Sequence, residues 1–188
     1  MGFVPINTFT LGLVLTAAFV AVLVQSAFDL TRWLCGAQLN LLPAIMVYAA
    51  LTCELPVLVL LALFAGLLFD SLSANPLGTM TVALFLPAWV MYLQRGLILR
   101  DLPFARFMLG LAATGVTPVI AMLILLSARE ELLLGWFSLG QWALLTVLGG
   151  LLTPLVMTAL DATRHALSYQ RVAENTFRND RQIRRGRR

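Results

Sequence analysis

The sequence has 188 residues, of which 60% are hydrophobic and only 12% are charged, and its mean hydropathy is +0.90. A soluble domain carries about 25% charged residues, so this composition excludes a water-soluble globular protein. The net charge is +4, and all 13 basic residues are arginine, because the chain contains no lysine.

Six apolar segments predict six membrane-spanning helices, because none of them has the polar face of a helix that borders water. In chain order they are Thr8–Phe28, Leu39–Cys53, Leu55–Phe69, Leu77–Gln94, Phe104–Ser127 and Phe137–Leu160. No basic residue precedes the first segment, so we interpret it as a retained helix rather than a cleaved signal. We predict an all-α membrane protein, with a six-helix transmembrane domain over residues 1–163 and an arginine-rich cytoplasmic tail over residues 164–188.

The second and third segments form an almost unbroken apolar run. A single helix over this run would be about 45 Å long, which exceeds the roughly 30 Å hydrocarbon core. Glu54 and Pro56 interrupt it, because a carboxylate is costly in lipid and proline disfavours helix at the preceding residue. We therefore predict a tight helical hairpin that turns at residues 54–56, with two short arms.

The arginines predict the orientation of the chain in the membrane. Arg95, Arg100 and Arg106 lie between the fourth and fifth segments, and eight more arginines lie between residues 164 and 188. Two predicted helices separate these groups, so the groups share one side, which the positive-inside bias makes cytoplasmic. Both termini are then cytoplasmic, and residues 70–76 face outward.

The basic tail has two interpretations. We expect Arg164–Thr176 to prolong the last helix and the sequence beyond Phe177 to be disordered. The arginines either attract anionic lipid headgroups or serve only as a solvated determinant of topology. With only two aromatic residues, Tyr169 and Phe177, and no folded scaffold, the tail does not resemble a nucleic-acid-binding segment.

The stretch from residue 65 to residue 78 contains the candidate partner-binding residues. Gly66 and Asp70 share one face of the third segment, and small residues on a helix face let another helix approach closely. Asn75, Pro76 and Gly78 follow, in a pattern typical of a tight turn into the next helix.

Asp70 itself has two interpretations. It either binds a partner or substrate at the outer membrane boundary, or it is a structural acid that pairs with loop amides or with an arginine such as Arg129. Glu54 is interpreted as a turn residue, and Asp161 as half of a salt bridge with Arg164 at the cytoplasmic interface.

Glycine and proline shape the last two segments, at Gly110, Gly115, Pro118, Gly149, Gly150 and Pro154. A proline inside a spanning helix commonly kinks it, because one backbone hydrogen bond is lost. Such positions either line a cavity or allow close packing.

The sequence contains none of the residue patterns expected of an enzyme. His165, in the tail, is the single histidine, so a histidine metal site or a catalytic triad within the membrane is excluded. There is no phosphate-binding loop and no carboxylate pair at helical spacing. We expect no catalysis, no metal and no cofactor.

The order of motifs from Leu39 to Leu93 resembles the rod shape-determining protein MreD family. The matching positions are Pro43, Tyr48, Gly66, Asp70, Pro76, Leu77, Gly78, Tyr92 and Leu93, and the run from Gly149 to Pro154 is a weaker match. About 55 residues carry the resemblance, while the rest of the chain agrees only in helix number, length and basic C-terminus. The arginine-rich extension is longer than the family pattern implies.

The resemblance implies a non-catalytic role in the cell-elongation machinery of rod-shaped bacteria. It implies MreC as the primary partner, and indirect links to MreB, to the glycosyltransferase RodA and to its penicillin-binding protein. The implied fold is similar to the substrate-binding subunits of energy-coupling-factor vitamin transporters. The alternative function is therefore a vitamin-binding subunit of such a transporter, although the outer segments offer few polar or aromatic groups for it (Asp29, Trp33, Asn75 and Trp136).

Overall fold

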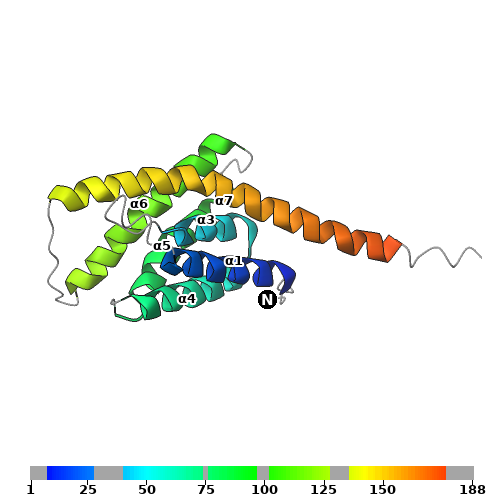
Figure 1. Ribbon diagram of the computed structural model, residues 1–188, viewed down its shortest axis with the longest axis horizontal. Coiled ribbons are helices and arrows are strands. Elements are labelled where there is room, and N and C mark those ends of the chain that lie inside the picture. The colour runs from blue at the N-terminus through cyan, green and yellow to red at the C-terminus, as the bar shows by residue number, and fades with distance from the viewer. Residues whose placement is uncertain (1–7, 28–39, 74–75, 97–101, 128–135, 177–188) are drawn as a thin grey trace, which may run out of the picture. The chain divides into compact units, whose positions relative to one another are not determined.

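The computed structural model describes residues 8–27, 40–73, 76–96, 102–127 and 136–176. These residues form α-helices and no strand (Figure 1). The helices are α1 (Thr8–Ala27), α3 (Leu42–Thr52), α4 (Leu55–Leu72), α5 (Thr79–Gln94), α6 (Pro103–Ser127) and α7 (Trp136–Thr176). The described residues confirm the prediction of an all-helical fold, and each of the six predicted segments overlaps one helix, although α4 and α7 extend beyond the predicted ends.

The chain divides into two compact units, Met1–Met157 and Thr158–Arg188. The first unit contains α1 to α6 and the first half of α7. The second begins within α7, whose helix continues to Thr176, as the sequence predicted. The predicted disorder beyond Phe177 lies outside the described residues.

Helices α3 and α4 form the hairpin that the sequence predicted. Helix α3 ends at Thr52, Cys53 and Glu54 are extended, and Pro56 lies in the first turn of α4, where its missing N–H costs no helical hydrogen bond. Arg95 closes the hairpin, because its Nη1 donates to the carbonyl oxygen of Cys53 at 3.2 Å. The Arg95 guanidinium also stacks on the Tyr92 ring, with 4.3 Å from Cζ to the ring centroid.

Helix α3 is the innermost helix of the first unit. All ten residues from Leu42 to Leu51 are buried, and α3 contacts α1, α4, α5 and α6. Its 11 residues span only about 17 Å, roughly half of a hydrocarbon core. Its uniform apolarity therefore reflects protein on every side, whereas the sequence alone predicted a membrane-spanning segment.

The outer helices carry their apolar side chains outward. Leu63, Leu67, Val116 and Leu123 are among many large hydrophobic residues that remain exposed. Three helical stretches in the described part of the chain are long and apolar enough to cross a membrane: Leu55–Leu72, Pro103–Ser127 and Leu139–Ala166. The shorter apolar stretches are Thr10–Ser26, Leu42–Thr52 and Thr79–Gln94.

Helices α6 and α7 pack through two reciprocal glycine–threonine contacts. A Cβ atom on Gly110 would collide with Thr153 of α7, and one on Gly149 would collide with Thr114 of α6. Each threonine hydroxyl donates to the carbonyl oxygen of the glycine four residues earlier, at 2.6 Å for Thr114 and 2.8 Å for Thr153. Gly110 and Gly149 therefore serve close packing, which was one of the two interpretations of the sequence.

Replacement of Gly110 by alanine tests this contact. We expect Gly110→Ala to lower the free energy of unfolding by about 1–3 kcal/mol, the usual cost of an overpacked core. Thr153 is fully buried and cannot move aside without losing its own hydrogen bond. The measurement is equilibrium unfolding of the purified protein in detergent.

Gly140→Ala is the matched control, because nothing lies within 4 Å of a Cβ atom at Gly140 in α7. It should leave stability unchanged or raise it by about 0.5–1 kcal/mol, since alanine favours helix over glycine. Equal effects of the two substitutions would contradict the reciprocal packing.

Candidate functional site

Asp70 joins the end of α4 to the beginning of α5. Its side chain is only 2% exposed. Its carboxylate accepts a hydrogen bond from the backbone N–H of Gly78 at 2.8 Å and from that of Met80 at 3.1–3.2 Å. The geometry agrees with the structural interpretation of Asp70, a helix-end acid that binds loop amides, while Arg129 lies outside the described residues.

The local sequence explains why Asp70 binds there. The first amides of a helix have no partner within it, and the positive end of the helix dipole favours a carboxylate. Gly78 precedes α5 with φ of 96°, a left-handed conformation that a side chain would disfavour. Asp70 therefore serves as the N-terminal cap of α5, although it belongs to a different helix.

Gly66 lies one turn earlier on the same face of α4. A Cβ atom on Gly66 would collide with the backbone and the hydroxyl of Thr81 in α5. The close helix approach that the sequence predicted therefore occurs within this chain. The space beside Gly66 that was assigned to a partner helix is already filled by α5, so a Gly66→Leu substitution would disturb folding as well as any complex.

The remaining predicted site residues lie in the turn between α4 and α5. Pro76 and Leu77 are exposed, Leu77 by 73%, and Gly78 is half-buried. Asn75 lies outside the described residues. The structure thus brings Asp70 and Gly78 into direct contact and leaves Pro76, with its neighbour Leu77, at the surface.

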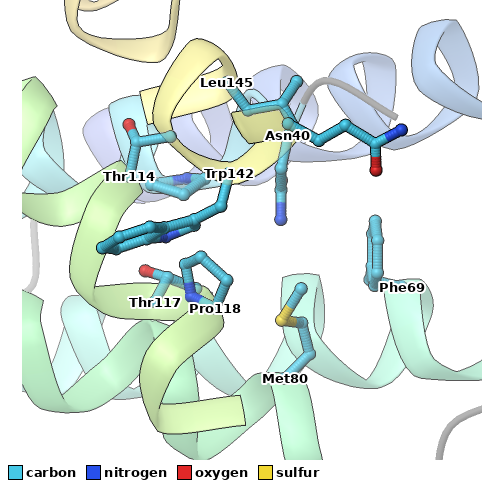
Figure 2. Close-up of a pocket in the computed structure, with 10 residues that line it drawn as sticks. Asn40, Phe69, Met80, Thr114, Thr117, Pro118, Trp142 and Leu145 are labelled. Carbon is cyan, nitrogen blue, oxygen red and sulfur yellow. The ribbon is translucent and has the colours of Figure 1, made fainter. Parts of the chain in front are cut away.

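A cavity of about 270 Å³ lies beside this turn. Its walls come from Asn40, two residues before α3, and from α3, α4, α5, α6 and α7. Asn40, Phe69, Met80, Thr117, Gln141 and Trp142 are among the residues that line it (Figure 2). Trp142 is held in place because its Nε1 donates to the carbonyl oxygen of Gly115 at 3.1 Å.

Sequence reasoning missed most of this cavity. It pointed to Asp29, Trp33, Asn75 and Trp136 as outer polar or aromatic groups; the first three lie outside the described residues, and the side chain of Trp136 is not described. It anticipated that Pro118 marks either a cavity or a packing site, and Pro118 does line the cavity. The other cavity residues could have been sought near Gln141 and Trp142, because this pair lies inside an otherwise apolar segment.

The chemistry available in the described part of the chain is limited. Among these residues no three histidine, cysteine or acidic side chains are grouped as a metal site would require. No family model matches the sequence, and no curated protein or solved structure is similar enough to count as a match. The arrangement of Asp70, Gly78 and the cavity is therefore the basis for the functional proposal.

Removal of the Asp70 carboxylate tests its role as a cap. We expect Asp70→Ala to lower the free energy of unfolding by about 2 kcal/mol or more, because buried amides that lose their acceptor cost about 1–3 kcal/mol each. Asp70→Asn should cost less, since one carbonyl oxygen remains to accept. Thermal unfolding in detergent provides the comparison.

Ser71→Ala is the neighbouring control. Ser71 is exposed and its hydroxyl binds only the Leu68 carbonyl oxygen of its own helix. A surface substitution of this kind changes stability by about 0.5 kcal/mol at most. If Asp70→Ala were equally mild, the cap would not stabilise the α4–α5 junction.

Proposed function

We propose that this protein is a non-catalytic membrane scaffold of the bacterial cell-elongation machinery, of the MreD type. The observation that carries the proposal is the use of Asp70. This acidic residue of the resembling stretch binds the two amides at the start of α5. It thereby fixes the shape of a surface turn, which suits a residue that presents a binding surface to another protein.

The proposal includes a location and an orientation. The protein lies in the bacterial inner membrane with both termini in the cytoplasm and about six spans, three of which are long enough by themselves. The α4–α5 turn then faces the periplasm. In support, Arg95 lies at the opposite end of α5 beside the α3–α4 hairpin, and arginine favours the cytoplasmic side.

The primary partner in this proposal is MreC, the membrane-anchored periplasmic scaffold protein that MreD-like proteins bind. MreB, RodA and its penicillin-binding protein are linked indirectly, and lipid surrounds the outer helices. The contact surface on this chain comprises Pro76 and Leu77, together with Asn75. Gly66, Asp70 and Gly78 act behind that surface, by fixing the turn.

One observation favours the alternative function, a vitamin-binding subunit of an energy-coupling-factor type transporter. The cavity beside the α4–α5 turn has the position expected of a substrate site open to the outside. Affinity purification after in-cell crosslinking separates the two functions. MreC and wall synthases in the eluate support the scaffold, whereas transporter ATPases support the alternative.

A charge placed on the exposed turn tests the proposed surface. We expect Leu77→Glu to reduce recovery of MreC at least tenfold, because a carboxylate at a desolvated contact costs several kcal/mol. Leu77 is 73% exposed and bears no part of the core, so the stability of the isolated protein should not change.

Leu93→Glu is the control at the other end of α5, where Leu93 is 65% exposed. It should leave recovery of MreC unchanged. Normal recovery with Leu77→Glu would place the partner elsewhere on the protein.

A further inference from the structure

The cavity beside the α4–α5 turn contains groups that a scaffold does not need. Trp142 of α7 and Phe69 of α4 lie on opposite sides of it, and Met80 lies below them in the view of Figure 2. Aromatic side chains stack with planar rings, and such pairs add about 0.5–1.5 kcal/mol beyond burial of area. The hydrogen bond from Trp142 to Gly115 holds this wall in position without a ligand.

Asn40 supplies a directed hydrogen-bond donor. Its Oδ1 accepts from the backbone N–H of Leu42 at 3.0 Å, which fixes the plane of the amide. The Nδ2 group is thereby left to donate, and Figure 2 shows it pointing toward the centre of the cavity. Gln141 contributes a second amide to the lining.

The cavity favours an uncharged occupant. Among the described residues that line it, none carries a charge. An ion moved from water into such surroundings would lose its hydration without gaining a partner. A volume of about 270 Å³ accommodates about 13 non-hydrogen atoms at the packing density of protein interiors.

We propose that this cavity binds an uncharged, planar ring compound of one or two fused rings that carries a carbonyl or similar hydrogen-bond acceptor. The ring packs between Trp142 and Phe69, and its acceptor receives the Nδ2–H of Asn40. Such a ring occurs both in free heteroaromatic compounds and in the ring head groups of lipids. The proposal goes beyond the scaffold function and does not depend on it.

The test uses three probes of one shape with the full-length protein in detergent: 2-naphthamide, 2-naphthoate and naphthalene. Isothermal titration should show 2-naphthamide binding at least tenfold more tightly than either of the others. Compared with 2-naphthamide, 2-naphthoate carries a negative charge, and naphthalene lacks the hydrogen-bond acceptor. Equal affinity for all three would overturn the proposal, because partition into the micelle would explain it.

Three variants assign the binding to the cavity. Asn40→Asp keeps an oxygen that accepts from the Leu42 amide but removes the Nδ2–H donor. It should lower the affinity for 2-naphthamide at least tenfold. Trp142→Leu removes a wall and should do the same. Trp89→Leu is the matched control, since Trp89 of α5 is 40% exposed, like Trp142 at 39%, but lies outside the cavity. Undiminished binding to Asn40→Asp would overturn the proposal, even if Trp142→Leu did not fold.

A fourth probe distinguishes the two sources of the ring. N-dodecyl-2-naphthamide carries the same ring on an alkyl chain, as a lipid head group would. Tighter binding than that of 2-naphthamide, lost in Trp142→Leu and kept in Trp89→Leu, indicates a ring borne by a lipid. Weaker binding of the chain-bearing probe indicates a free compound. These binding measurements use the protein without MreC, so a failure of the scaffold proposal would not change their outcome.

Discussion

The burial of α3 is the constraint around which the first unit is built. An 11-residue helix with ten consecutive buried residues must be covered on every side, and α1, α4, α5 and α6 provide that cover. These neighbours can approach because small residues lie at their contacts, as Gly66 does against Thr81. Their own long side chains are left to face outward, where a membrane would replace water.

Threonine appears repeatedly where helices pack most closely. Thr114, Thr117 and Thr153 are buried, and each donates its hydroxyl hydrogen to the carbonyl oxygen four residues earlier in its own helix. A polar side chain satisfied in this way needs no partner on the neighbouring helix. It can therefore occupy an apolar interior at little cost, and its small size fits the space opposite a glycine.

Much of the fold could be predicted from the sequence, because long apolar segments separated by charged or turn residues leave few alternatives. The hairpin was predictable from Glu54 and Pro56, whose effects on a helix are local. The environment of each helix face was not predictable, because α3, which is buried in protein, and α4, which carries exposed leucines, are both strongly apolar. For the same reason the sequence predicted that Gly66 contacts a partner protein, whereas the helix that packs against it is α5 of the same chain. Asn40 and Trp142 line one cavity although they lie far apart in the sequence, so only the folded structure brings them together.

The anchoring of α5 at both ends has a consequence for how the protein enters a membrane. Asp70 binds the first amides of α5, and Arg95 at its other end binds the carbonyl oxygen of Cys53 in the α3–α4 hairpin. In the proposed membrane protein, α3 is too short to cross the bilayer by itself. We therefore expect it to enter the membrane together with α4 and α5, because the two contacts hold these three helices together.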